Sequence, residues 1–367
     1  MLFLLMRRKL RITQVIILYL SILFLMMLSI VYTVSAELTT RFLLVMGYGG
    51  VLYIAVGEMN RAKEMVTRVL LTFSMMNVLI TVASIFFPET FATVMSQLLP
   101  NVNAKFTFAS GIMGQTGTNA YVICYGLLYW LILLSGNPKS KLKTIVLLAL
   151  SLFALFLTGK RGPLIWVGAT FLIVDLIRRK TMGEKNPLKR LWQYALLVAA
   201  LMVFIAIIDS NELIQQTFDR FTVEEDGDFS SGRLELYKRA ILIIKENVFL
   251  GIGAGAYNYY GIGAHNDYLQ IFAENGLLCS ALFFIFIGWN IKNAYQSYCL
   301  EKDVKSLYVL ALQVFMALNA LTGTSYLHFG FYFVFMELSA ASYNDRITAA
   351  IQRRTRLTND APINRMG

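Results

Sequence analysis

The chain has 367 residues, of which 57% are hydrophobic and 15% are charged, and its mean hydropathy is +0.59. These values are typical of a polytopic membrane protein and leave no room for a soluble globular domain. The net charge of +11 is explained by basic loops beside anionic lipid, so it does not indicate binding to nucleic acid.

Apolar runs of about 17–25 residues are long enough to cross a bilayer. The sequence contains ten such runs, two of them short, at about 12–34, 42–57, 66–87, 117–135, 142–158, 163–177, 191–208, 266–289, 306–323 and 325–343. We therefore expect an all-α polytopic membrane protein with about ten transmembrane helices.

The basic residues predict the topology, because cytoplasmic loops retain lysine and arginine. Most of the 33 basic residues fall on the inner side if both termini are cytoplasmic. The expected organisation is then helices 1–7 in residues 1–208, a large extracytoplasmic loop in 209–265, helices 8–10 in 266–343 and a basic cytoplasmic tail in 344–367. Basic residues left outside, mostly at 158–163 and in the loop, call for a functional explanation.

The outer loop changes character along its length. Its first part, EEDGDFSSGR, is acidic and contains glycine, so we expect it to be mobile. Apolar residues at helix spacing then predict an amphipathic helix at the outer surface, and Ser230 and Ser231 are expected to cap it, with Arg233 in its first turn. The apolar positions are Leu234, Tyr237, Ile241, Ile244 and Val248.

Positive charges recur where helices begin at the expected outer face. Lys160 and Arg161 precede Gly162 and Pro163, and proline suits the first position of a helix. Other predicted helices begin near His265 and Ser325 at the same level. Positive helix ends and arginine forks suit a multiply charged anion such as a phosphate.

His265 is one of two histidines in the chain and stands at the mouth of a predicted membrane helix. In that helix, Asp267, Gln270 and Glu274 share one face. Polar groups at membrane depth are costly unless they face protein or water, so we expect this stripe to line an interior site.

Each of these features also has a structural explanation. Arg161 is equally explained as an anchor at the membrane boundary, Arg233 as a solvated helix residue and His265 as an interfacial cap. Glu274 is as well explained by pairing with polar neighbours as by a role in a mechanism.

No cofactor is expected. Cys124, Cys279 and Cys299 form no CxxC motif and no paired framework outside the membrane, and the two histidines have no second ligand at helical spacing. We predict a metal-free protein.

The order of four motifs resembles the O-antigen ligase and Wzy-type polymerase superfamily over residues from about 106 to 290. The motifs are GIMGQTGTNAY, which places Asn119 at a family asparagine, TGKRGP, SSGRLELY and GIGAGAY followed by AHNDYLQIFAENG. The last of them is the most specific.

This resemblance implies metal-independent, inverting glycosyl transfer at the outer face of the bacterial cytoplasmic membrane. The donor is an undecaprenyl-diphosphate-linked glycan and the acceptor is a glycan hydroxyl. Arg161 and Arg233 are expected to neutralise the leaving diphosphate, with His265 as general base. The expected substrate-binding residues are Lys160, Asn119, Asn266, Asp267, Gln270, Glu274 and Tyr257.

Three functions remain open. We favour a polymerase of repeat units for O-antigen, capsule or exopolysaccharide, because polymerases are the more widespread members and no feature specifies a lipid A acceptor. The first alternative is an O-antigen ligase that transfers finished glycan to lipid A core or another acceptor. The second is a membrane transporter or flippase, although no internal repeat supports it. A flippase and a chain-length regulator are possible protein partners.

Overall fold

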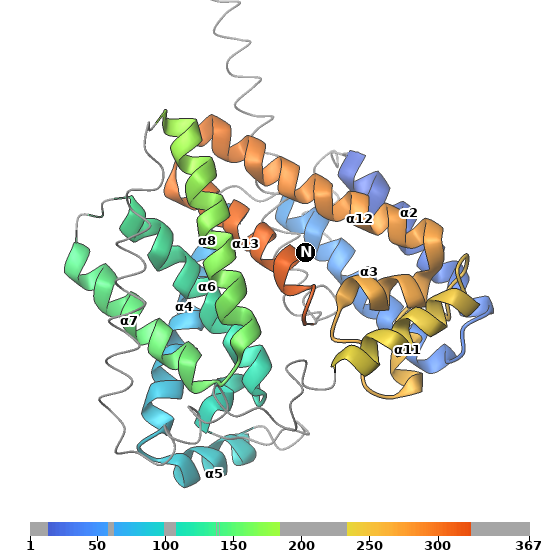
Figure 1. Cartoon of the computed structure of the whole chain (residues 1–367), viewed down its shortest axis with the longest axis horizontal. Coiled ribbons are helices and arrows are strands. Elements are labelled where there is room, and N and C mark those ends of the chain that lie inside the picture. Colours follow the sequence, from blue (N-terminus) through green and yellow to red (C-terminus); the bar gives the residue numbers. More distant parts are fainter. Residues whose placement is uncertain are drawn as a thin grey trace, which may run out of the picture.

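The computed structural model describes residues 14–57, 62–98, 108–136, 138, 140–183 and 233–323, and Figure 1 shows their arrangement. Every regular element within these ranges is a helix, as predicted for an all-α protein. In chain order they are α2 (Gln14–Leu28), η1 (Ser29–Val31), α3 (Ala36–Gly57), α4 (Ala62–Ser84), α5 (Pro88–Leu98), η2 (Phe108–Met113), α6 (Thr116–Ser135), α7 (Lys141–Leu157), α8 (Arg161–Met182), α11 (Arg233–Glu246), η4 (Ala256–Tyr260), α12 (Asp267–Glu301) and α13 (Val304–Asn319).

Several of these helices are suited to a membrane. Three described helices are long and apolar enough to cross it, namely Lys63–Ser84, Thr116–Ser135 and Asp267–Glu301. Val15–Val31 and Val304–Asn319 are shorter apolar helices. Eight of the ten predicted spans coincide with described helices, whereas the predicted spans 191–208 and 325–343 lie outside the described residues. The number of spans and their orientation stay predictions.

Helix α13 lies at the centre of the described helices (Figure 1), where it packs against α12, α8 and α6. Its residues from Leu307 to Gln313 are all buried, and Tyr308 and Phe315 are among the largest fully buried side chains. Helices α12, α8 and α6 therefore cover most of the surface of α13, and other segments meet at its two ends.

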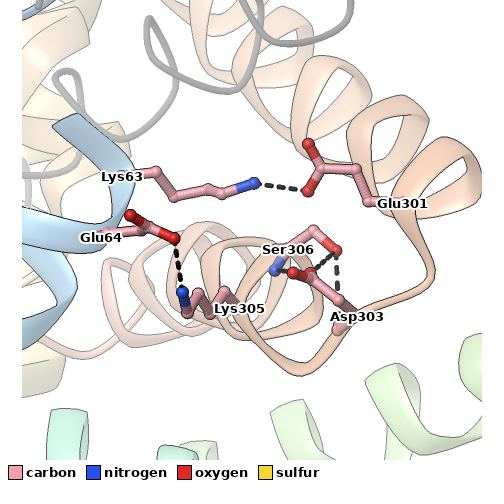
Figure 2. Close-up of polar contacts among 6 residues, drawn as sticks. All are labelled: Lys63, Glu64, Glu301, Asp303, Lys305 and Ser306. Carbon is pink, nitrogen blue, oxygen red and sulfur yellow. Dashed lines mark hydrogen bonds and ion pairs between the residues drawn. The ribbon is translucent and has the colours of Figure 1, made fainter. Parts of the chain in front are cut away.

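At one end of α13, ion pairs join the start of α4 to the connection between α12 and α13 (Figure 2). Lys63 contacts Glu301, and Glu64 Oε1 lies 2.7 Å from Lys305 Nζ. Asp303 caps α13 by accepting a hydrogen bond from the Ser306 amide at 2.7 Å. With both termini on the inner side, the predicted order of spans puts both connecting segments in the cytoplasm, and their side of the membrane stays a prediction.

The predicted span 266–289 belongs to a longer helix with a break inside it. Helix α12 covers 35 residues, but Gly276 has φ 66° and ψ −173° and interrupts it. A Cβ on Gly276 would lie 2.2 Å from the carbonyl oxygen of Phe249, so only glycine fits this conformation and this close approach. The polar stripe of Asp267, Gln270 and Glu274 therefore occupies a short helix ahead of the main span.

Helix α11 confirms that a helix begins at Arg233, but it corrects the predicted buried face. Ala240 and Ile243 are its buried residues, whereas Leu234 and Ile241 of the predicted apolar face are 57% and 42% exposed. The buried face turns toward the glycine-containing segment after the helix, where Ile252 and Tyr257 join the same apolar cluster. The proposed capping residues Ser230 and Ser231, and the acidic part of the loop, lie outside the described residues.

Candidate active site

Four helices meet at the end of α13 opposite to the ion pairs. The Asp267 amide, at the start of α12, donates to the Ala320 carbonyl at 2.9 Å. The hydroxyl of Tyr237 in α11 donates to the Leu321 carbonyl at 3.2 Å, and the indole of Trp166 in α8 donates to Thr322 Oγ1 at 2.7 Å. The first two bonds satisfy carbonyl groups that the end of a helix leaves unpaired, and all three bring the starts of α8, α11 and α12 to one level.

Lys160 and Arg161 lie at this level, at the start of α8. The helix begins at Arg161 with Lys160 as N-cap, two residues earlier than expected, so Pro163 stands in the first turn, where its missing N–H is no loss. Both cationic side chains are exposed. Lys160 leans over the start of α6, because its Cε lies 4.0 Å from the position that a Cβ on Gly117 would take.

His265 immediately precedes the N-cap of α12 and has a left-handed backbone with φ 50°. Few residues other than glycine adopt this conformation, although histidine does so more often than most. Partial burial lowers the pKa of His265 from its ordinary value of 6.5, and the positive charges of Arg233 and Lys160 lower it further. The three side chains therefore share one electrostatic neighbourhood, and the imidazole is neutral at pH 7.

Three other cationic side chains, Arg41, Lys238 and Arg239, have a partner within the protein, whereas Arg233 has no described one. Arg41 pairs with Glu37 at 2.7 Å, Lys238 pairs with Glu235 at 2.6 Å, and Arg239 donates to the Tyr260 carbonyl at 3.1 Å. Within the part of the chain that the structure describes, Arg233 has no ion pair or hydrogen bond.

The charge of Arg233 acts on two neighbouring side chains. Its guanidinium acts electrostatically on His265 and on the hydroxyl of Tyr121 in α6. A half-buried arginine without a carboxylate partner is suited to bind an anion. The neighbourhood of Lys160, Arg233 and His265 can therefore neutralise negative charge beside a neutral imidazole.

Glu274 lies in the interior, where it holds the glycine-rich segment in place. Its carboxylate accepts hydrogen bonds from the amides of Gly255 at 3.0 Å and Tyr257 at 3.2 Å. The side chain of Gln270 donates to it at 3.0 Å and accepts from the Ala264 amide at 3.1 Å. This network ends at the residue before His265, so Glu274 and Gln270 fix the chain that carries the imidazole.

Glycines allow this segment to lie directly against α12. Gly251, Gly253 and Gly255 all have positive φ, and the Gly253 amide donates to the Glu274 carbonyl at 2.9 Å. A Cβ on Gly251 would lie 2.4 Å from that carbonyl oxygen. The GIGAGA run is therefore a packed turn around the helix break at Gly276.

The remaining predicted site residues occupy three different environments. Asn266 caps α12 by accepting a hydrogen bond from the Leu269 amide at 3.1 Å, and it lies next to His265. Asp267 is fully buried and acts electrostatically on Tyr121. Tyr257 is fully buried, in contrast to the exposed Tyr259 and Tyr260, so a contact of Tyr257 with substrate stays a prediction that this conformation does not display.

Asn119 lies in the protein interior near the start of α6. It is fully buried, and its amide nitrogen donates to Thr81 Oγ1 and to the Ala109 carbonyl, each at 2.9 Å. These bonds tie η2 and α4 to the start of α6. The structure does not bring Asn119 to the side chains of Lys160, Arg233 and His265 through any described contact, and a role in substrate binding stays a prediction.

Three residues at the meeting point were not identified from the sequence. Tyr121 and Asn319 meet at Gly323, and Thr322 accepts a hydrogen bond from Trp166, through the packing of α6, α8 and α13. No motif includes them, because their position depends on contacts between distant helices. A polar residue on the inward face of an otherwise apolar span was the available signal.

Among the residues that the structure describes, no group of three or more histidine, cysteine, aspartate or glutamate side chains is placed to hold a metal ion. The three cysteines are free thiols, and Cys124 and Cys279 are buried. Whether the protein works without a metal stays a prediction with a direct test.

Residues 146–284 match the family model described as O-antigen ligase, whereas no curated protein matches the chain. The match runs from α7 into α12 and includes Lys160, Arg161, Arg233 and His265, while Asn119 precedes it. Members of this family are glycosyltransferase-like membrane proteins that act as ligases or polymerases on lipid-linked glycans. The match to residues 146–284 confirms, over that part of the chain, the family resemblance drawn from the motifs.

Proposed function

We propose that this protein is a polymerase that joins undecaprenyl-diphosphate-linked oligosaccharide repeat units at the outer face of the bacterial cytoplasmic membrane. The observation that carries the proposal is the shared electrostatic neighbourhood of Arg233, Lys160 and His265. These residues come from three separate segments of the matched residues 146–284. A pair of cations next to a neutral imidazole matches the two needs of glycosyl transfer from a diphosphate.

The first need is to neutralise the leaving group. Arg233 and Lys160, together with Arg161 at the first residue of α8, are the proposed contacts of the diphosphate oxygens. The N-terminal amides of α8 add a positive dipole end at the same place. Each donor aimed at the developing charge contributes a few kcal/mol to the rate, on the order of 3 kcal/mol, so a divalent cation is not needed.

The second need is to remove a proton from the acceptor. In the proposed step, the hydroxyl oxygen of the acceptor sugar attacks the anomeric carbon of the donor and forms the new glycosidic bond. The bond from that carbon to the diphosphate oxygen breaks, and its electron pair leaves with the undecaprenyl diphosphate. The hydroxyl proton passes to the neutral imidazole of His265 and then to water. Direct displacement inverts the anomeric configuration.

The other predicted residues take supporting parts in this proposal. Asn266 contacts the sugar near His265 and the buried Asp267 anchors the start of α12 at the Ala320 carbonyl, while Gln270, Glu274 and Tyr257 hold the segment that carries the imidazole. Asn119 supports the start of α6 beneath the site.

The ligase reaction uses the same donor and the same charges, so it remains the second candidate. A flippase is the third, and it requires no catalytic base. The experiment is a gel profile of lipid-linked and mature surface glycan from cells that carry His265→Ala. Its matched control is His328→Ala, because these are the two histidines of the chain.

Each outcome assigns one function, provided that both variants reach wild-type membrane levels. Loss of the polymer ladder with single repeat units left on the lipid supports the polymerase. A full ladder retained on undecaprenyl diphosphate identifies a ligase instead. An unchanged profile removes His265 from catalysis and favours the transporter.

A further inference from the structure

Tyr121 lies on the face of α6 that Lys160 covers. Gly117 and Tyr121 are four residues apart in this helix, so they occupy the same face one turn apart, at about 5–6 Å. Lys160 Cε lies 4.0 Å from the position of a Cβ on Gly117. Tyr121 therefore lies one helical turn below the ammonium-bearing side chain of Lys160.

The Tyr121 hydroxyl points to the end of α13. A Cβ on Gly323 would lie 2.5 Å from the Tyr121 hydroxyl oxygen and 3.5 Å from the Asn319 amide nitrogen. Glycine at position 323 thus leaves the space in which these two polar groups meet. Asn319 is hydrogen-bonded to Tyr121 through their side chains, and the position of its amide nitrogen makes Asn319 the donor.

Because the phenolic oxygen accepts from Asn319, the phenolic proton remains to be donated. In the part of the chain that is described, Tyr121 makes no hydrogen bond in which its hydroxyl donates. Arg233 acts electrostatically on this oxygen, and Asp267 acts on it with the opposite sign. Tyr121 as a residue is only partly buried, and its hydroxyl lies in the small space beside Gly323. This hydroxyl is a neutral donor that feels the charge of Arg233.

We propose that Tyr121 is a substrate-contacting residue whose hydroxyl donates a hydrogen bond to the diphosphate group held by Arg233 and Lys160. This inference rests on the proposed function, because it assumes a polyprenyl diphosphate at these cations. Neutral donors complement cations at such a site, since they fix the orientation of an oxygen that a lysine attracts only as a point charge.

The experiment measures binding of undecaprenyl diphosphate to the purified full-length protein in nanodiscs, together with the rate of glycan transfer in cells. Tyr121→Phe removes only the hydroxyl. A hydrogen bond to a charged group corresponds to about tenfold in affinity or more, so we expect a loss of that size in binding and a slower transfer. Tyr125→Phe is the matched control, because Tyr125 lies one turn further along α6 and is buried.

Gly323→Ala provides a second variant in case Tyr121→Phe lowers the melting temperature. Its methyl group would push the hydroxyl away while keeping the phenol, and the same loss of binding is expected. If Tyr121→Phe and Gly323→Ala bind undecaprenyl diphosphate as the wild type does, the role of Tyr121 is refuted while the proposed function stands. If the wild-type protein does not bind undecaprenyl diphosphate, the proposed function fails and the role of Tyr121 fails with it.

Discussion

The carboxylate of Glu274 accepts a hydrogen bond from the backbone amide of Gly255 at 3.0 Å. Glu274 is fully buried on the short first part of α12, and Gly255 lies in the glycine-rich segment that leads to His265. A buried carboxylate is costly unless its lone pairs are used, and here two backbone amides and Gln270 use them. The acidic residue of the most specific motif therefore shapes the backbone behind the imidazole.

Removing this carboxylate destabilises the protein. Glu274→Ala leaves the amides of Gly255 and Tyr257 buried without acceptors, at about 1–3 kcal/mol each. We expect a clear fall in the melting temperature of the detergent-solubilised protein. Glu246→Ala serves as control because Glu246 is exposed at the end of α11 and should leave the melting temperature unchanged. Equal stability of both variants would show that the Glu274 network contributes nothing.

Gly276→Ala tests the break in α12. A methyl group at this position meets the Phe249 carbonyl oxygen at 2.2 Å and requires φ 66° and ψ −173°, a conformation nearly confined to glycine that costs other residues about 1–3 kcal/mol before any clash. We expect a loss of folded protein in membranes, measured by fluorescence size-exclusion chromatography. Gly288→Ala, in the same helix with open space around its Cβ position, should be tolerated. Normal folding of Gly276→Ala would contradict the break.

The pH dependence of transfer should follow His265. A general base must be neutral, so activity falls as the pH drops through the pKa of His265, which lies below 6.5. Lys160 is one of the charges that lower this pKa, so Lys160→Gln should raise it and move the acid limb of the rate profile to higher pH. Lys238→Gln removes a charge that pairs with Glu235 and should not move the limb. An acid limb that stays in place in Lys160→Gln would refute the electrostatic contact.

Substitutions of Arg233 separate charge from geometry. Arg233→Ala should reduce transfer by about 100-fold, because one lost donor to developing charge corresponds to about 2.7–4 kcal/mol. Arg233→Lys keeps the charge but loses the planar fork, and we expect an intermediate rate. Rates are measured with the native lipid-linked repeat unit, with Arg239→Lys as the control on the same helix. Full activity of Arg233→Lys would argue against a bidentate contact with the diphosphate.

Chelation tests the metal-free mechanism. Because cationic side chains neutralise the leaving diphosphate in the proposed step, EDTA in excess over all divalent cations should leave the rate of transfer in proteoliposomes unchanged. The measurement compares rates before chelation, after it and after adding back Mg²⁺. A rate that collapses with EDTA and returns with Mg²⁺ would assign a divalent cation to the site.

Local patterns in the sequence were enough to predict the all-α class and the family resemblance that residues 146–284 bear out. Hydrophobic runs and basic loops are local signals that do not depend on distant contacts, so the apolar helices were predicted to within a few residues at α6 and α7. Motif order also singled out Arg161, Arg233 and His265 as candidate site residues, and their roles stay a prediction. The left-handed backbone of His265 and the break at Gly276 were not apparent, because helical periodicity continues through the break.

The tertiary structure decided which of these residues meet. Arg233 and Lys160 act on His265 because the starts of α8, α11 and α12 converge on the end of α13, and no spacing in the sequence encodes that convergence. The same packing buried Tyr257 and turned Glu274 toward backbone amides. It also brought Tyr121 and Asn319 together at Gly323, since contacts between distant helices depend on how the bundle packs around its central helix.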